Sequence, residues 1–303
     1  MIEATDQHAE FNPKGSVVAL VTPMATNGDI DWHALEGLLE WHLEQGTAAI
    51  GAVGTTGESA TLTVPEHCEM IEFCARWSNG RIPILAGTGA NSTREAIELS
   101  LAAEAAGADA CLSVTPYYNK PNQAGLIAHF TAIADVVTIP QVLYNVPGRT
   151  SVDLTNESAL ALLQHPRIVA IKDATGDVKR GIDLIAKVSP GVAVYSGDDP
   201  TAHTLILNGG RGNISVTANV APKAVARLCQ AALERDHKCV EALVSSLAEL
   251  NRVLFLESNP IPVKWALCHL SKIEAGIRLP LTPLSQKYQG EVVAALEACK
   301  ELL

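Results

Sequence analysis

The sequence has 303 residues, of which 48% are hydrophobic, and a formal net charge of −11 at pH 7. This length suits one large domain, or a large domain with a small one beside it. The acidic balance argues against nucleic acid and anionic membrane surfaces as partners, because both bind clustered Lys and Arg. A small anionic ligand stays open, since a few local cations can bind one.

Cysteine and histidine usage narrows the class further. There are seven cysteines, an odd number, and no CxxC pair, so we interpret them as reduced thiols of a cytoplasmic protein. The N-terminal segment MIEATDQHAEFNPKG lacks the basic start and apolar run of a signal peptide. No apolar segment reaches the roughly 18 residues that span a bilayer. The nine histidines form no HxH or HExxH cluster, and we expect neither a metal site nor a cofactor.

Short apolar runs with the composition of buried strands recur along the chain. They are SVVALV (16–21), AAIGAVG (48–54), IPILAG (82–87), ACLSV (110–114), QVLYN (141–145), IVAIK (168–172), VAVYSG (192–197) and GNISV (212–216). Segments with helical spacing lie between most of them. In one of these, Ser92 and Glu95 predict a capping box and Gly107 the helix end, and Thr63 and Glu66 predict a second box.

Eight strand candidates alternating with helices indicate βα units and a parallel sheet. We therefore predict an α/β fold, a (β/α)8 TIM barrel, which typically takes about 250 residues. An open doubly wound sheet is the alternative, although no GxGxxG turn follows a strand.

The last part of the sequence has helical patterns and no convincing strand. These patterns are VEALVSSLAELNRVLF, PIPVKWALCHL and GEVVAALEACKELL, and they predict a small C-terminal helical extension. The chain is thus divided into an N-terminal extension (1–14), a catalytic barrel (15–234) and a C-terminal helical domain (235–303).

Polar residues follow several of the predicted strands directly. The second run leads into GTTGES, the fourth into TPYYN, the fifth into YNVPGRT and the seventh into SGDD, while the sixth ends in Lys172. The active site of a parallel barrel lies at the carboxyl ends of its strands. We therefore expect these groups to converge on one rim.

Lys172 closes a strand that otherwise reads as fully buried. In an apolar barrel mouth an ammonium loses hydration, and a neutral amine can attack a ketone to form a Schiff base, an electron sink for making or breaking a carbon–carbon bond. The alternative is a structural lysine paired with a carboxylate at a loop edge. The strand by itself leaves both interpretations open.

Three neighbouring motifs supply further candidate groups. Tyr144 can relay protons if Thr55 or Thr56 completes the chain, or it is a core tyrosine with its hydroxyl satisfied. Backbone N–H groups of GTTGE suit a carboxylate, although the motif also reads as a turn before a helix. Arg149 can clamp a second carboxylate through its planar fork, or it is a surface arginine.

Taken together and in order, these motifs resemble one known family. GAVGTTGESATL, GTGAN, VTPYYNKP, YNVPGRT, IKDATG, SGDD, ISVTANV and NPIPVKWAL are similar to the dihydrodipicolinate synthase family, within the N-acetylneuraminate lyase superfamily of class I aldolases. The resemblance extends from about residue 15 to the C-terminus. It implies a lyase that condenses pyruvate with L-aspartate-4-semialdehyde in lysine and diaminopimelate biosynthesis, most often as a homotetramer built as a dimer of dimers.

The resemblance also implies roles for single residues. Lys172 would form the Schiff base with pyruvate, and Tyr144 would relay protons with Thr56 and with Tyr118 of a neighbouring subunit. The remaining substrate contacts would come from Thr55 and Thr56 at the pyruvate carboxylate, Arg149 at the carboxylate of the semialdehyde, and the backbones of Gly197 and Ile214 around the pocket.

An allosteric site for L-lysine is the last implied feature. The matching residues are Ser59, Ala60, His67, Asn91, Glu95 and Tyr117. Val64 stands where some lysine-inhibited relatives have a second histidine, so inhibition by lysine is expected to be weaker here. The KDATG motif also departs from the KEATG of many relatives, with little expected effect because the acid flanks the nucleophile.

Two other function classes stay in view. A retro-aldolase of sialic acid or of a keto-deoxy sugar acid would share Lys172 and Tyr144. Arg149 favours the synthase, because its guanidinium can bind the carboxylate of a small aldehyde. A polyhydroxylated substrate would require more polar loops. A non-catalytic barrel used for binding or regulation would not need Lys172 or Tyr144, and both are present.

Overall fold

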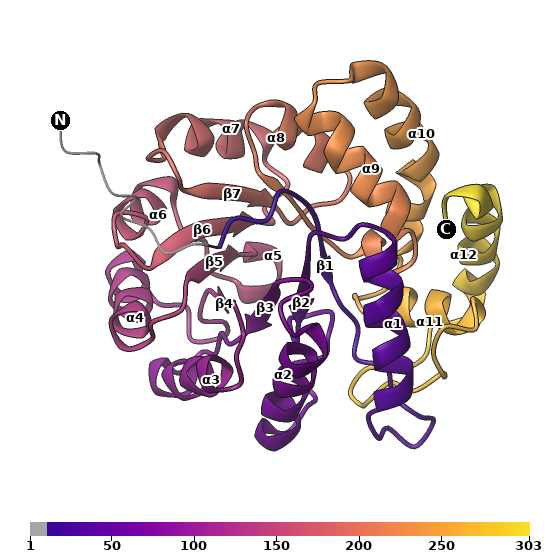
Figure 1. Ribbon diagram of the computed structural model, residues 1–303, viewed down its shortest axis with the longest axis horizontal. Helices are drawn as coiled ribbons and strands as arrows, with labels where there is room; N and C mark the ends of the chain where they lie inside the picture. The colour runs from indigo at the N-terminus through magenta and orange to yellow at the C-terminus, as the bar shows by residue number, and fades with distance from the viewer. Residues whose placement is uncertain (1–10) are drawn as a thin grey trace.

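The computed structural model describes residues 11–303, and most of the predicted N-terminal extension, residues 1–10, lies outside the described residues. Eight parallel strands form a closed barrel in chain order (Figure 1). They are β1 (Gly15–Ala19), β2 (Ala49–Ala52), β3 (Ile84–Gly87), β4 (Ala110–Val114), β5 (Gln141–Asn145), β6 (Ile168–Asp173), β7 (Ala193–Ser196) and β8 (Gly212–Ser215). The predicted barrel is confirmed, and the open-sheet alternative is excluded.

Helices surround the barrel as the βα rhythm predicts (Figure 1). They are α1 (Trp32–Glu44), α2 (Val64–Ser78), α3 (Thr93–Ala105), α4 (Gln123–Val136), α5 (Pro147–Thr150), α6 (Asn156–Leu162), α7 (Val178–Lys187), α8 (Ala202–Leu207) and α9 (Pro222–Leu233), with a 3₁₀ turn η1 (Thr217–Asn219) after β8. The short α5 is an addition to the simple alternation, and it carries the PGRT motif.

The barrel closes where β1 pairs with β8, with Gly15 opposite Gly212. A Cβ atom built on Gly212 would lie 2.0 Å from the carbonyl oxygen of Gly15. No side chain fits at that distance, so the close approach of the two strands depends on glycine.

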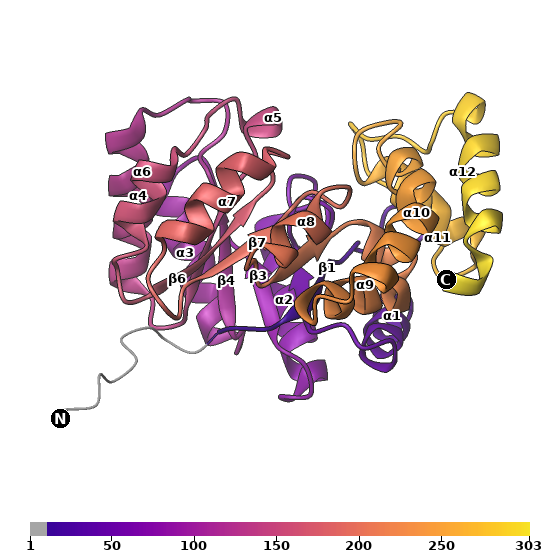
Figure 2. The ribbon, with the colours of Figure 1, turned by 90° about the horizontal axis from the view of Figure 1, so that it is seen from above.

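The C-terminal helices α10 (His237–Val253), α11 (Ile261–His269) and α12 (Gln286–Ala298) form a group at one side of the barrel (Figure 2). The chain ends in a 3₁₀ turn, η2 (Lys300–Leu302). The helical extension is confirmed, although α12 begins four residues before the predicted GEVVAALEACKELL segment. The division at residue 235 stays a prediction, because α9 and α10 pack closely across it.

The N-terminal caps of α2 and α3 differ in their hydrogen bonds, and the difference affects which groups are available at the site. At α2 both halves of the predicted box form, since Thr63 caps the Glu66 N–H and the Glu66 carboxylate accepts from the Thr63 N–H. At α3 the Ser92 hydroxyl accepts from the Glu95 N–H, but no return bond from Ser92 to the Glu95 carboxylate is found within residues 11–303. The Glu95 carboxylate is therefore left over for another contact.

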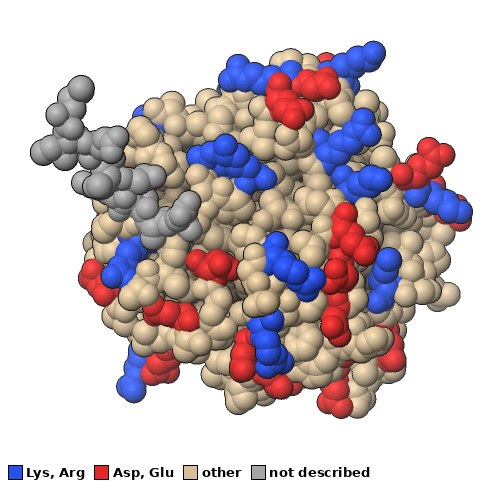
Figure 3. Space-filling view, in the orientation of Figure 1, with Lys and Arg blue, Asp and Glu red and all other residues tan. Residues whose placement is uncertain are grey.

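The surface carries charges of both signs. Acidic and basic side chains are interspersed over the face shown in Figure 3, without a continuous basic field. In the part of the chain that the structure describes, no helix combines the length and apolar character needed to cross a bilayer.

Candidate active site

Lys172 lies at the carboxyl end of β6, and its side chain points into the barrel. Its neighbour Ile171 packs against the outer helical layer, and successive side chains of a strand face opposite sides. The ammonium lies 4.3 Å from the centre of the Tyr144 ring, and Tyr144 is the residue opposite Lys172 on β5. Only 6% of Lys172 is exposed.

No carboxylate pairs with Lys172 among residues 11–303. The adjacent Asp173 points to the other side of the strand, where Oδ1 accepts from the Thr175 N–H at 2.9 Å and Oδ2 lies 3.5 Å from Nε of Arg180. The structural alternative for Lys172, a lysine held by an acid, is therefore wrong. Because Asp173 faces away from Lys172, aspartate in place of the glutamate of KEATG leaves the surroundings of the ammonium unchanged.

Gly197 makes room for the lysine side chain. A Cβ atom on Gly197 would lie 2.6 Å from Cε of Lys172 and 2.7 Å from Cβ of Ala174. Any side chain at this position would push Lys172 away, which gives a steric reason for glycine beside the sixth strand. Ile214 on β8 packs in the same interior cluster as Tyr144, so the structure places both predicted pocket-shaping residues at the barrel interior.

The GTTGES loop after β2 holds Thr55 half-buried and Thr56 buried. Oγ1 of Thr56 accepts a hydrogen bond of 2.9 Å from the side-chain amide of Asn259. No hydrogen bond between Thr56 and Tyr144 is found in the described part of the chain, so the predicted relay is not closed in this structure.

Arg149 lies on α5, just after the strand that carries Tyr144. Its Nη2 donates to the backbone carbonyl of Asn259 at 3.0 Å, and the residue is otherwise exposed. No acid pairs with Arg149 within residues 11–303, so the guanidinium is open to a carboxylate from solution.

The two adjacent tyrosines of TPYYN take different positions. Tyr118 is 88% exposed and has a φ of 74°, a left-handed conformation that costs a non-glycine residue energy. Tyr117 instead lines a cavity with the GTTGES loop. A single chain therefore does not bring Tyr118 to Lys172.

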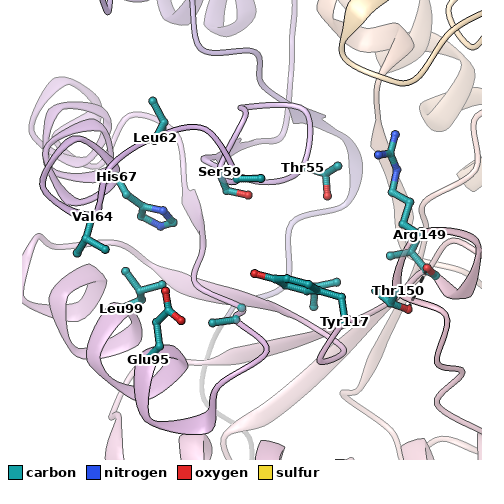
Figure 4. A pocket seen from close by; sticks show the side chains of 15 residues that line it. Thr55, Ser59, Leu62, Val64, His67, Glu95, Leu99, Tyr117, Arg149 and Thr150 are labelled. Carbon is teal, nitrogen blue, oxygen red and sulfur yellow. Dashed lines mark hydrogen bonds between the residues drawn. The ribbon is translucent and has the colours of Figure 1, made fainter. Parts of the chain in front are cut away.

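A cavity of about 270 Å³ opens beside the strand ends. Figure 4 shows His67, Glu95 and the Tyr117 hydroxyl at one end, and Thr55 and Arg149 at the other. Five of the six predicted lysine-site residues line it: Ser59, Ala60, His67, Glu95 and Tyr117. The sixth, Asn91, does not line it, and its carbonyl accepts from the Asn119 side chain.

The electrostatics of this cavity favour a cation. Nε2 of His67 lies 2.7 Å from the Gly87 carbonyl oxygen, and burial lowers the pKa of His67, which keeps the imidazole neutral. Burial and the charge of Glu95 raise the pKa of Tyr117. The Glu95 carboxylate, which has no ion-pair partner within residues 11–303, is thus the main charge at that end of the cavity.

Sequence reasoning missed a second group of residues near the rim. Lys264 on α11 forms a buried ion pair with Glu58, with Nζ 3.1 Å from Oε2, and Asn259 contacts Thr56 and Arg149. All three lie in motifs singled out above, GTTGES and NPIPVKWAL, but these three residues were not assigned a role from the sequence. A lysine within the apolar run VKWAL was a detectable signal, because buried lysines need a partner.

Comparison with known proteins agrees with this arrangement. The chain matches the dihydrodipicolinate synthetase family over residues 12–299. It is 59% identical over 285 residues to the 4-hydroxy-tetrahydrodipicolinate synthase of Marinobacter nauticus, covering 94% of this chain and 98% of that protein. The enzyme of the same name from Stutzerimonas stutzeri is 59% identical over 282 residues, with 93% and 97% covered.

Solved structures show the same likeness. The chloride-inhibited dihydrodipicolinate synthase from Acinetobacter baumannii, complexed with pyruvate, has a TM-score of 0.94 and 56% identity, covering 96% of this chain and 99% of that one. The enzyme from Cyanidioschyzon merolae with lysine bound has a TM-score of 0.92 and 37% identity, with 95% and 99% covered. With these matches over nearly its whole length, the chain belongs to the dihydrodipicolinate synthetase family.

Proposed function

We propose that this enzyme condenses pyruvate with L-aspartate-4-semialdehyde to give 4-hydroxy-tetrahydrodipicolinate, in lysine and diaminopimelate biosynthesis. The observation that carries the assignment is Lys172, a buried amine at the carboxyl end of β6 with no acid partner in residues 11–303, in a chain similar to 4-hydroxy-tetrahydrodipicolinate synthases over 94% of its length. It is a lyase of the class I aldolase type.

In the proposed mechanism the amine of Lys172 attacks the ketone carbon of pyruvate. The carbonyl oxygen leaves as water once it is protonated, and the resulting Schiff base loses a methyl proton to give an enamine. The enamine carbon then attacks the aldehyde carbon of the second substrate, whose oxygen takes up a proton. The amine of that substrate finally attacks the Schiff-base carbon, which closes the ring and displaces the amine of Lys172. Tyr144 is well placed to carry these protons, because its ring lies directly beside Nζ of Lys172.

The substrate contacts follow from the positions of the remaining groups. Thr55 and Thr56 present a loop with backbone N–H groups and hydroxyls for the pyruvate carboxylate. Arg149 faces the rim without an acid partner among the described residues and receives the carboxylate of the semialdehyde. Gly197 and Ile214 leave the space in which the bound pyruvate lies.

A coupled assay with both substrates, run beside a sialic acid cleavage assay, tests this function. We expect condensation with pyruvate and aspartate semialdehyde and no cleavage of sialic acid, because Arg149 has no acid partner within residues 11–303 and suits a small carboxylated aldehyde. Cleavage of sialic acid at a higher kcat/KM than condensation would favour the retro-aldolase instead.

The exposure of Tyr118 supports an assembly of several chains. A tyrosine that is 88% exposed in a left-handed conformation costs free energy in an isolated chain. In the proposed homotetramer, a dimer of dimers, Tyr118 completes the proton relay of a second copy. Sedimentation of the wild type and of Tyr118→Ala tests this: we expect a tetramer with lower kcat in the variant, whereas a fully active wild-type monomer would contradict it.

We propose that L-lysine inhibits the enzyme by binding in the cavity that contains Glu95. Its side-chain ammonium would bind the Glu95 carboxylate, and its carboxylate the Tyr117 hydroxyl. Asn91, which does not line the cavity in this structure, would have to turn its side chain toward the ligand to contribute. The half-formed cap at α3 supports this assignment, because it leaves the Glu95 carboxylate without a hydrogen-bond partner in the described part of the chain. A lysine titration of the wild type and of Glu95→Ala tests it: we expect partial inhibition, non-competitive with pyruvate, that is lost in the variant. Unchanged inhibition of Glu95→Ala would exclude the site.

A further inference from the structure

Asn259 holds the guanidinium of Arg149 through its backbone carbonyl. Nη2 of Arg149 donates to this oxygen at 3.0 Å, and the guanidinium makes no other hydrogen bond within residues 11–303. Asn259 itself is 5% exposed and lies between α10 and α11. No backbone N–H of the described residues donates to its carbonyl oxygen, so the contact with Arg149 has no competitor there.

An arginine that binds a substrate carboxylate benefits from such a contact. Arg149 lines the cavity together with Thr55 (Figure 4), and a long exposed side chain of this kind samples many rotamers. Fixing one Nη2 donor limits these rotamers before the substrate arrives, and it leaves the other N–H groups of the planar fork for a carboxylate. Preorganisation of this kind lowers the entropy that binding costs.

Asn259 is in turn fixed by the loop after β2. Its side-chain amide donates to Oγ1 of Thr56 at 2.9 Å, and its side-chain oxygen has no partner in the described residues. Lys264, on the helix that follows Asn259, pairs with Glu58 of the same loop, with Nζ 3.1 Å from Oε2. Two contacts therefore hold this segment against the loop, and the bond to Thr56 is the one at residue 259 itself. Such support keeps a binding group in its productive geometry.

We infer that Asn259 is a positioning residue for the aldehyde substrate: its backbone carbonyl, held in place by the hydrogen bond from its side chain to Thr56, sets the direction in which the Arg149 guanidinium meets the carboxylate of the aldehyde. The inference rests on the proposed function, in which Arg149 binds that carboxylate. The side chain of Asn259 acts only through the position of the carbonyl, because Arg149 contacts the backbone of residue 259.

Asn259→Ala removes the hydrogen bond to Thr56 and keeps the backbone carbonyl. The carbonyl is then free to shift, so the guanidinium loses its fixed direction. We expect kcat/KM for the aldehyde to fall about 3- to 10-fold, the factor that corresponds to one net hydrogen bond. Borohydride trapping of pyruvate at Lys172 should still go to completion at saturating pyruvate, because Schiff-base formation does not involve Arg149.

A double-mutant cycle with Arg149 shows whether Asn259 acts through the guanidinium. In an Arg149→Ala background there is no guanidinium to direct, so Asn259→Ala should cause no further loss of kcat/KM for the aldehyde. The same loss in both backgrounds would overturn the inference, since it would show that Asn259 acts through Thr56 or through packing. A normal kcat/KM for the aldehyde in Asn259→Ala would overturn it as well.

Asn251→Ala is the matched control, because Asn251 is a second buried asparagine of the C-terminal part that contacts a threonine. Its Oδ1 accepts from Oγ1 of Thr217 at 2.7 Å, and no contact with Arg149 is found within residues 11–303. We expect a lower thermal midpoint and a kcat/KM for the aldehyde within about twofold of the wild type. A loss as large as that of Asn259→Ala would overturn the inference, since destabilisation alone would then explain both.

A second variant covers the case in which Asn259→Ala does not fold, as judged by its thermal midpoint. Asn259→Ser then takes its place with the same expected results, because its shorter side chain does not reach Thr56 while a polar atom stays in the buried site. Borohydride trapping of pyruvate at Lys172 of the wild type tests the proposed function separately. An active, trapped wild type with an indifferent Asn259 contradicts only the inference, whereas an inactive wild type contradicts the function.

Discussion

Two buried lysines, Lys172 and Lys264, occupy different regions of this molecule. Both follow apolar residues, and they are 6% and 3% exposed. Lys264 lies on α11 and reaches the Glu58 carboxylate, with Nζ 3.1 Å from Oε2. Lys172 lies on β6 and faces the ring of Tyr144, with no acid partner among residues 11–303.

The difference shows what distinguishes a structural lysine from one that is suited to act as a nucleophile. Burial lowers the pKa of Lys264 and raises the pKa of Glu58, while the charge of each partner opposes the effect of burial. The pair holds the GTTGES loop against α11. A nucleophilic amine needs a lone pair that no neighbouring acid holds in place, and only the β6 lysine meets that condition.

The largest expected effect comes from removing the proposed nucleophile, Lys172. Lys172→Arg should lower kcat about 10⁴-fold or more, because the guanidinium stays protonated and cannot form the Schiff base. Peptide mass spectrometry after treatment with pyruvate and borohydride should find the reduced adduct at Lys172 of the wild type and none in the variant.

Lys264 is the internal control for that experiment. Its ammonium is equally buried but paired, so its peptide should stay unmodified. An adduct on Lys264, or on an exposed lysine such as Lys120, would contradict the assignment of Lys172.

The second prediction breaks the paired lysine. Lys264→Met leaves the Glu58 carboxylate buried without its partner, which should cost about 3–5 kcal/mol of stability. Urea denaturation should show the loss, and Glu58→Gln added to Lys264→Met should recover part of it, because the unpaired charge is gone. Equal stability of Lys264→Met and the wild type would mean that the pair does not brace the loop.

The third prediction concerns Arg149 at the rim of the barrel, which has no acid partner in the described residues. Arg149→Ala should lower kcat/KM for the aldehyde by about 30- to 1000-fold, the cost of roughly 2–4 kcal/mol for a lost bidentate charged contact. Pyruvate trapping at Lys172 should largely survive, because that step needs no aldehyde. Steady-state kinetics with a normal aldehyde dependence would show that Arg149 is only structural.

The smallest expected effect lies at a partly exposed pair beside Lys264. Hydrogen bonds from Arg278 lower the pKa of Glu66 from 4.5 to about 2. A carboxyl group with a depressed pKa stabilises the fold above its ordinary pKa, and this contribution is lost as pH falls toward the folded value.

Glu66→Gln should therefore cost about 1 kcal/mol near pH 7, discounted for partial solvent screening. The stability difference from the wild type should narrow as pH falls below about 4.5. Urea midpoints measured across this range check the sign. A difference that grows on acidification would contradict the assigned ion pair.

Local sequence patterns were enough for the elements of the fold. Each of the eight apolar runs became a strand, because β-branched and aliphatic residues bounded by turn residues suit a strand buried on both faces. The chain order of the strands followed from the βα rhythm. Only one half of the capping box predicted at Ser92 forms. The return bond depends on the direction of the Glu95 side chain, and that side chain faces the cavity instead.

The candidate site was predictable where it follows strand ends. Lys172, Tyr144, Thr55 and Thr56 could be named because the carboxyl ends of parallel strands meet at one rim. Asn259 and Glu58 could not, since their contacts join residues about 200 positions apart in the chain, and no local pattern encodes such a contact.

The barrel, the helical extension and the candidate nucleophile could all be predicted from sequence patterns, because periodicity and strand-end chemistry are local properties of a chain. Those patterns did not decide which of two lysines in apolar runs is paired. That depends on whether a carboxylate from another part of the chain lies within reach, and only the folded structure brings Glu58 to Lys264 while it turns Asp173 away from Lys172. An apolar run is enough to predict that a lysine is buried. Whether that lysine has a carboxylate partner depends on residues that long-range packing brings to it.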